Sequence, residues 1–439
     1  MKPRSFYSLL MISLSLLLVN MLSAQIQFFR PVNKDGINVF EAPKEQGEEF
    51  DGVKVRVGGA FSLQYQALKH ENENPTANAD NTLYKLGSGF NLATANLNLD
   101  VQLADGIRLN LENYMSSRHH NEFWVKGGYI QIDKLPMFGN PEWFSKYVRV
   151  KLGHMQPNYG DQMMRRTDNG NAIYNPFVGN YIMDAFTTEV GGEAYIFPVK
   201  GISLMLGLTN GFINYNQIKY ADEPESGNLE PTKKNPSLYL KGSFDKNITE
   251  NFRFRLSASM VTNSSTQRNT LFGGDRTGSR YYWVLENTKA TLTANAFSGR
   301  FNPGFTNNLT AFQINPFIKF HGLELFGAFE SAKGRTYKEA DGNERKATQL
   351  EGELVYRFLK NEQMYIGGRY NSVNATMRVG ANNVDVNLDR TAFVAGWFPT
   401  PNLLLKMEIV NQNYKDFPNT DIRYNGKFNG LTIEAVVGF

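Results

Sequence analysis

Residues 53–66 of the chain read VKVRVGGAFSLQYQ. Apolar residues recur at every second position for most of this stretch, at Val53, Val55, Val57, Phe61, Leu63 and Tyr65. Polar residues fill the positions between them, at Lys54, Arg56, Ser62, Gln64 and Gln66. Successive side chains of a β-strand point to opposite faces, so this alternation predicts a strand with one apolar and one polar face.

The same alternation returns along the rest of the chain. It is clear in the segments 93–103, 148–152, 252–256, 350–358 and 431–439. Segment 281–310 is ambiguous, and we expect either one long strand or a hairpin there. No helical period or internal repeat competes with the period of two, which favours an all-β fold.

The predicted connections alternate between short and long. Short turns are expected at 104–106, 198–201, 321–322, 359–363 and 399–402, and long polar connections at about 68–88, 156–184, 210–236, 331–347 and 411–427. This is the arrangement of an outer-membrane barrel, with short periplasmic turns and long outer loops. We therefore predict a transmembrane antiparallel β-barrel of about 16 to 18 strands. The alternative is a β-sandwich, but a sandwich of ~100 residues is too small for so many hairpins.

Composition narrows the class of protein. The 439 residues are 41% hydrophobic and 13% aromatic, include 39 Gly and no Cys, and carry a formal net charge of +4. The mean hydropathy of −0.40 argues against a bundle of transmembrane helices. Disulfides and thiolate metal sites are excluded, and the small net charge disfavours nucleic acid as a partner.

The N-terminus has the pattern of an export signal. Lys2 and Arg4 precede an apolar run that ends at Leu22, and small residues follow before Gln25. Residues 1–24 are therefore expected to be a signal peptide, and the run is too short for a membrane-spanning helix.

The rest of the chain is expected to have two parts. Residues 25–50 have no clear period, and we expect a periplasmic N-terminal extension or a plug that enters the lumen. Residues 51–439 are expected to form the barrel and to place the protein in the cell outer membrane. Phe439 ends an alternating strand, like the terminal signal of bacterial outer-membrane barrels.

If the apolar faces meet lipid, the polar faces line a lumen. The strand phase and the loop described below predict these residues at the pore lining or constriction: Arg149, Lys151, Arg165, Arg166, Arg253, Arg255, Glu189 and Glu193. Two interpretations remain open: the charges select solutes by their field, or they pair and brace the barrel wall.

The longest distinctive connection is KLGHMQPNYGDQMMRRTDNGNAIYNPFVGNYIMDAF, residues 151–186. It lacks alternation, and a long loop without its own fold is often functional. We expect it to fold into the lumen as a constriction loop, with Arg165 and Arg166 facing the pathway. A solvent-facing outer loop is the alternative.

A resemblance to a known family rests on three parts of the sequence. They are the block GHMQPNYGDQMMRRTDNGNAIYNPFVGNYIMDAFTTEVGGE (153–193), the stretch GVKVRVGGAFSLQYQALKH and the terminal Phe439. Together they resemble the phosphate-selective porin O and P family, in particular members from the Bacteroidetes group of Gram-negative bacteria. The resemblance implies a 16-stranded trimeric porin with an inward-folded loop and a basic lumen that guides anions. Only Arg165, Arg166, Arg149 and Lys151 match the basic ladder of that family, and the many inward Glu residues depart from it.

These observations favour a porin that lets small hydrophilic solutes diffuse passively, with a possible preference for anions such as phosphate. Its expected partners are outer-membrane lipid and lipopolysaccharide, those solutes, and two further copies in a homotrimer. The alternatives are a barrel with a closed pore that serves secretion or surface binding, and a barrel hydrolase using His154 or the pair His119 and His120. No catalytic motif is present, so we expect no enzyme, cofactor or metal site.

Overall fold

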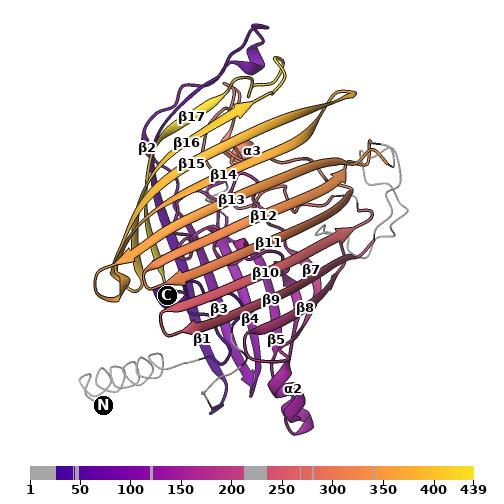
Figure 1. Ribbon diagram of the computed structural model, residues 1–439, viewed down its shortest axis with the longest axis vertical. Helices are drawn as coiled ribbons and strands as arrows, with labels where there is room; N and C mark the ends of the chain where they lie inside the picture. The colour runs from indigo at the N-terminus through magenta and orange to yellow at the C-terminus, as the bar shows by residue number, and fades with distance from the viewer. Residues whose placement is uncertain are drawn as a thin grey trace, which may run out of the picture.

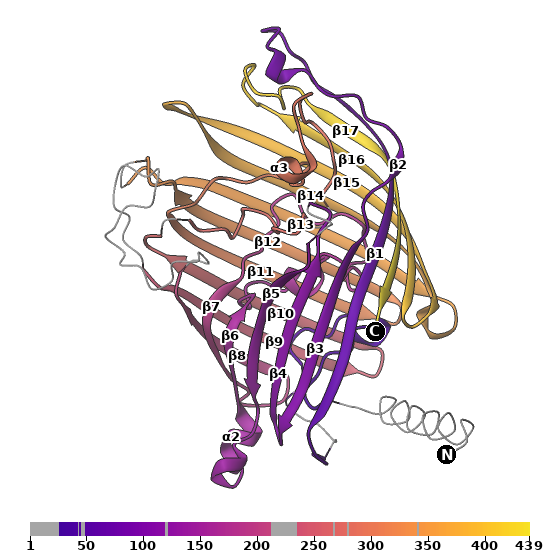
Figure 2. The same ribbon diagram turned by 180° about the vertical axis from the view of Figure 1, so that it is seen from behind.

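The structure, a computed structural model, describes residues 26–42, 44, 49–118, 122–211, 235–266, 268–278, 281–339 and 342–439. In these ranges the strands form one antiparallel sheet that closes into a barrel (Figures 1 and 2). The strands are β1 (Lys54–Glu71), β2 (Gly89–Phe90), β3 (Thr94–Ala104), β4 (Ile107–Met115), β5 (Trp124–Ile132), β6 (Val148–Met155), β7 (Glu189–Ile196), β8 (Ile202–Thr209), β9 (Ser237–Thr249), β10 (Phe252–Asn263), β11 (Asn308–Phe320), β12 (Leu323–Arg335), β13 (Arg345–Phe358), β14 (Met364–Val379), β15 (Asn382–Thr400), β16 (Leu403–Lys415) and β17 (Lys427–Gly438).

The barrel closes through its first and last strands. β1 pairs with β17 over Ala60–Glu71 and with β3 over Lys54–Ser62. β2 has only two residues and pairs with β1 beside Tyr65. Without β2, the 17-stranded sheet of the described residues has 16 strands that build the wall, which confirms the predicted barrel.

The two ends of the barrel differ in their connections. The short turns at 105–106, 250–251, 321–322 and 401–402 lie at the same end as the start of β1 and the end of β17. In outer-membrane barrels this is the periplasmic end. The connection between β5 and β6 also lies there and carries α2 (Glu142–Tyr147), which projects from the lower end of the barrel in Figures 1 and 2.

The outer connections are long, with one exception. β14 and β15 are joined by Gly380 and Ala381 alone, and Gly380 has a φ of +59°, which Gly adopts at little cost. No helix in the described ranges has the length and apolar character needed to cross a bilayer.

The barrel is inverted relative to a water-soluble fold, because its buried side is polar. On β13, Glu351, Glu353 and Arg357 point inward and are at most 4% exposed. Leu350 and Leu354 alternate with them and are 59% and 48% exposed on the outer surface. The apolar face therefore meets lipid, and the polar face is covered by protein inside the lumen.

The expectation of a strand or hairpin in segment 281–310 is wrong. β11 begins at Asn308, and the connection from β10 spans residues 264–307. The described residues of this connection contain one helix, the short α3 (Leu292–Asn295), and no strand. Tyr282, Val284 and Phe301 are buried in this connection, so they resemble strand residues in sequence while packing inside the lumen.

Candidate functional site

The connection between β6 and β7, residues 156–188 (the β6–β7 loop), crosses the lumen and bonds to strands on several sides. The backbone N–H of Gly160 donates to Ser259 of β10, and that of Asp161 donates to Asn315 of β11, at 2.9 and 2.8 Å. Further along, the N–H of Val178 donates to Glu408 of β16 at 2.9 Å. The predicted inward fold of this loop is confirmed.

Polar side chains of the wall satisfy the backbone of this loop. The Lys406 ammonium donates to the carbonyls of Ala172, Asn175 and Phe177 at 3.0, 3.1 and 2.9 Å. Arg369 donates to the carbonyl of Gly179 at 2.8 Å. A buried loop needs partners for its backbone groups, and inward-facing Lys and Arg residues supply them here.

Gly170 shows how closely the β6–β7 loop approaches the wall. A Cβ at this position would lie 2.7 Å from the carbonyl oxygen of Ala60 on β1 and 2.8 Å from Cα of Ala95 on β3. Asn169 beside it has a φ of +54° and donates to the carbonyls of Ala95 and Met115. The Asp-Asn-Gly sequence thus permits a tight bend directly against the sheet.

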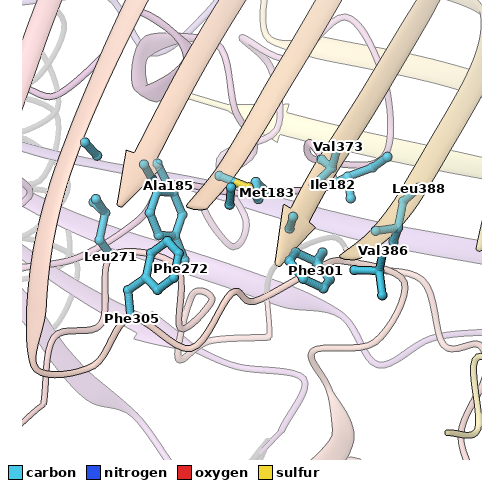
Figure 3. Packing of buried hydrophobic residues seen from close by; sticks show 14 of the residues in the cluster. Ile182, Met183, Ala185, Leu271, Phe272, Phe301, Phe305, Val373, Val386 and Leu388 are labelled. Atoms are coloured by element: carbon cyan, nitrogen blue, oxygen red, sulfur yellow. The ribbon is translucent and has the colours of Figure 1, made fainter. Parts of the chain in front are cut away.

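The connection between β10 and β11, residues 264–307 (the β10–β11 loop), packs on the β6–β7 loop. The N–H of Phe301 donates to the carbonyl of Ile182 at 2.7 Å, and the N–H of Phe186 to that of Leu271 at 2.8 Å. Figure 3 shows the shared apolar cluster in which Met183 and Phe301 of the two loops meet wall residues such as Val373. These two loops therefore form one packed unit inside the barrel.

Residues 26–42 (the N-terminal segment) lie in the lumen near the periplasmic turns. Gln27 accepts a hydrogen bond from the N–H of Gly106 at 2.8 Å, and the N–H of Lys34 donates to the carbonyl of Pro401 at 2.9 Å. Arg30 stacks on Tyr174 of the β6–β7 loop, with its guanidinium carbon 3.6 Å from the ring centre.

Arg149 and Lys151, which we predicted at the pore lining, lie on β6 and are both paired. Arg149 bonds to Asp133 at 2.8 Å and donates to the carbonyl of Ala42 at 2.7 Å. Lys151 lies 4.0 Å from Glu193 of β7, and its side chain is 20% exposed.

The two arginines of the β6–β7 loop point to different partners. Arg165 bonds to Glu353 of β13 at 2.8 Å and also donates to Asn38. Arg166 holds both oxygens of Asp184, at 2.8 and 2.6 Å, within its own loop. Both arginines are fully buried.

Arg253 and Arg255 on β10 share Asp245 of β9, at 2.6 and 3.2 Å. Arg255 also holds Asp161 of the β6–β7 loop through two bonds of 2.7 and 2.8 Å. It contacts Glu41 of the N-terminal segment at 2.8 Å. Arg255 is thus a junction between the wall, the loop and the segment.

Glu189 and Glu193 on β7 are buried and accept hydrogen bonds from neutral groups, and Glu193 also lies 4.0 Å from Lys151. Glu189 accepts hydrogen bonds from Tyr239, at 2.9 Å, and from Thr209. Glu193 accepts from the N–H of Asn158 at 2.5 Å and from Tyr195 at 2.7 Å. Glu193 therefore fixes the start of the β6–β7 loop to the wall, whereas Glu189 links β7 to β8 and β9.

Several charged partners were not predicted from the sequence: Glu41, Lys126, Asp161, Asp184, Asp275 and Arg369. Glu41 and Asp161 lie outside the alternating strands, so strand phase could not assign them to the lumen. Burial by itself would raise the pKa of Glu41, but the charges of Arg255 and Lys241 outweigh it and lower that pKa. Burial would likewise raise the pKa of Asp275, but the charges of Lys126 and Arg166 outweigh it and lower that pKa.

Two of the cavities beside this packing lie along the wall from β4 to β10. The inner cavity, of about 220 Å³, lies between β4–β6 and the β6–β7 loop. Its lining includes five basic side chains and three acidic ones. The basic ones are Arg30, Arg108, Lys126, Arg149 and Lys151, and the acidic ones are Glu41, Glu112 and Asp168. The periplasmic cavity, of about 590 Å³, is lined by residues 197–203, Lys44, Lys146 and Arg255, among others. Glu41 and Ala42 line both cavities.

Arg149 and Lys151 line the inner cavity and Arg255 lines the periplasmic one, whereas Arg165 and Arg166 line neither of these two cavities. His154 lines the inner cavity, and its Nε2 lies 2.9 Å from the hydroxyl of Thr188. His119 and His120 lie outside the described residues. Within the described ranges, no group of three or more acidic or His side chains is placed to hold a metal ion.

Three solved structures with a similar fold are outer-membrane proteins. The chain is similar to the outer membrane channel DcaP of Acinetobacter baumannii, with 11% identity, 90% of this chain and 100% of that chain covered, and a TM-score of 0.52. It is similar to an anion-selective porin from Comamonas acidovorans, with 10% identity, 88% and 100% coverage and a TM-score of 0.51. The fold is that of an outer-membrane porin.

The chain has the porin-like β-barrel fold of outer-membrane proteins. A third similar structure is OmpT of Vibrio cholerae in a trimer form, at 9% identity, with 89% of this chain and 100% of that chain covered and a TM-score of 0.50. No protein-family model matches this sequence, and no curated protein matches it either. At these identities the likeness concerns the fold, and solute selectivity must be argued from the lumen.

Proposed function

We propose that the protein is a narrow porin through which small hydrophilic solutes diffuse passively. The observation that carries this proposal is the pair of cavities that share Glu41 and Ala42 as lining residues. They follow the wall from β4 to β10, where most strands are short, and the β6–β7 loop borders the inner cavity. The solute route therefore runs along this wall and narrows beside the N-terminal segment.

The charges of the inner cavity favour anions. Five basic side chains line it against three acidic ones, and a guanidinium can engage two oxygens of one solute. Phosphate and carboxylates fit this chemistry. The resemblance of the 153–193 block to phosphate-selective porins supports phosphate as one such solute, while the paired state of Arg165 and Arg166 argues against a dense basic ladder.

Two partners belong to the same proposal. Outer-membrane lipid and lipopolysaccharide contact the exposed apolar residues of the outer surface, such as Leu350 and Ile409. The trimer form of a structurally similar porin supports a homotrimer for this chain.

A barrel with a closed pore that serves as a secretion or surface-binding partner is the second candidate. The filling of the lumen favours it, because the two loops and the N-terminal segment bury even large charged side chains such as Arg165, Arg166 and Arg255.

Planar-bilayer recording separates the two candidates. We expect discrete conductance steps from the purified protein, and in a KCl gradient a reversal potential that indicates preference for chloride. Replacing Lys151 by Gln should weaken this preference, because its charge faces the inner cavity. Absence of conductance steps would contradict the porin proposal, and a cation preference would contradict the anion route.

A further inference from the structure

Glu41 occupies a site that has the chemistry of a bound carboxylate. One of its oxygens lies 2.8 Å from Nη2 of Arg255, and the other lies 3.1 Å from Nζ of Lys241. The amide of Asn158 donates to the same carboxylate at 3.2 Å. Arg255 and Lys241 belong to neighbouring wall strands, so the cations are part of the barrel while the carboxylate comes from the N-terminal segment.

The position of this carboxylate separates the two cavities. Arg255 lines the periplasmic cavity, Asn158 lines the inner cavity, and Glu41 and Ala42 line both. A solute that moves between the cavities must therefore pass the place that the Glu41 side chain fills.

The charge of the site depends on Glu41. The carboxylates of Glu41, Asp161 and Asp245 face the cations of Lys241, Arg253 and Arg255, so the cluster is neutral. Without the Glu41 carboxylate the cluster would carry one net positive charge, and both Arg255 and Lys241 would have lost a partner. Asp161 and Asp245 would still pair with these cations, but a buried cluster with a net positive charge attracts an anion.

The N-terminal segment is held in the lumen without strand pairing. Its residues belong to none of the wall strands. Near Glu41 it is attached by side chains: Arg149 donates to the carbonyl of Ala42, Arg253 donates to the carbonyl of Asn38 at 3.0 Å, and Phe40 packs on Phe317 with ring centres 5.5 Å apart. Its departure would break no strand pairing of the barrel.

We propose that Glu41 is an internal ligand of an oxyanion-binding site formed by Arg255 and Lys241, and that an entering carboxylate or phosphate displaces it. This inference rests on the porin proposal and names its solute class and its regulation. Displacement moves residues 38–42 away from β9 and β10 and joins the periplasmic and inner cavities. The segment thus narrows the route in the absence of a suitable anion.

The absence of Cys from the chain permits a direct test. A single cysteine at Ala42, a residue that lines both cavities, reports access through its rate of reaction with a charged thiol reagent. We expect inorganic phosphate to raise this rate in the folded protein in detergent, relative to chloride at equal ionic strength and pH. An unchanged rate over the whole phosphate range would overturn the displacement.

Glu41→Gln in the same Ala42→Cys background removes the competing charge. Loss of charge-assisted hydrogen bonds worth about 1.5–3 kcal/mol shifts the equilibrium toward the displaced segment by roughly tenfold to a hundredfold. We expect faster labelling without phosphate and half-maximal response at a lower phosphate concentration. Asp35→Asn is the matched control, because Asp35 is an exposed carboxylate of the same segment, and its labelling should equal that of the parent.

A purely structural role for Glu41 predicts a different result. Glu41→Gln would then speed labelling equally in chloride and phosphate, with no change in the phosphate dependence, and this outcome would overturn the proposal. The labelling is measured without a membrane potential or current. A protein that conducts but shows no phosphate effect therefore refutes this inference alone, whereas a protein without conductance refutes the porin proposal alone.

Discussion

At the scale of single residues, the lumen is held by buried ion pairs rather than by apolar contacts alone. Arg166 is a clear case, since it bonds to Asp184 and also lies 3.6 Å from Asp275. Removing one partner of a buried pair is costly because the other charge is left without compensation. The arginines that we predicted from sequence as pore-lining groups therefore also have a structural role.

Replacing Arg166 by Ala should lower the free energy of unfolding by about 3–5 kcal/mol, because Asp184 and Asp275 stay buried. Urea unfolding in detergent micelles measures this change. Arg378→Ala is the control: Arg378 is exposed, so its loss should change the free energy by less than about 0.5 kcal/mol. Equal effects of the two substitutions would show that the Arg166 pairs contribute nothing.

At the scale of elements, alternation in the sequence predicted the strands and the short turns well. It failed in the β10–β11 loop because residues such as Tyr282 and Val284 belong to the apolar cluster inside the lumen and not to a strand face. It also could not reveal that Asp161 bonds to Arg255, since these residues are 94 positions apart and meet only when the loop folds inward. Local patterns therefore describe the wall, whereas the partners inside the lumen depend on the closed barrel.

The β6–β7 loop offers a test of this inward packing. Gly170→Ala places a methyl group against the backbone of Ala60 and Ala95, which cannot move without disturbing β1 and β3. We expect this bend to leave the wall, with faster amide hydrogen exchange in peptides that cover residues 165–175. Gly87→Ala is the control, because nothing lies within 4 Å of the added Cβ. Unchanged exchange in Gly170→Ala would contradict the close approach.

At the scale of the whole molecule, the barrel is a lipid-facing shell around a polar, protein-filled interior. Carboxylates from three separate segments that fill it, Glu41, Asp161 and Asp275, have a pKa below the ordinary value. In each case burial opposes the shift and neighbouring cations outweigh it. A carboxyl with a lowered pKa in the folded state stabilises the fold fully above its ordinary pKa, and this contribution is lost as the pH falls toward the lowered value.

The protein should accordingly lose thermal stability when the pH is taken from neutral to below about 4, the ordinary carboxyl range. The midpoint of thermal unfolding in detergent, followed by circular dichroism, measures this loss. In Glu41→Gln the acid-induced decrease should be smaller, because one contributing carboxylate is missing. The same pH dependence in Glu41→Gln and the parent would exclude Glu41 from the effect.

The N-terminal segment precedes β1 directly, and only residues 43–53 join Ala42 to Lys54. A segment on so short a tether cannot diffuse away once it is displaced, and its effective concentration at the vacated site is in the millimolar range or above. A solute therefore competes with the Glu41 carboxylate, whose effective concentration at the site does not change when the protein is diluted. The length of this tether, together with the strength of the Glu41 contacts, sets the external anion concentration at which the route responds.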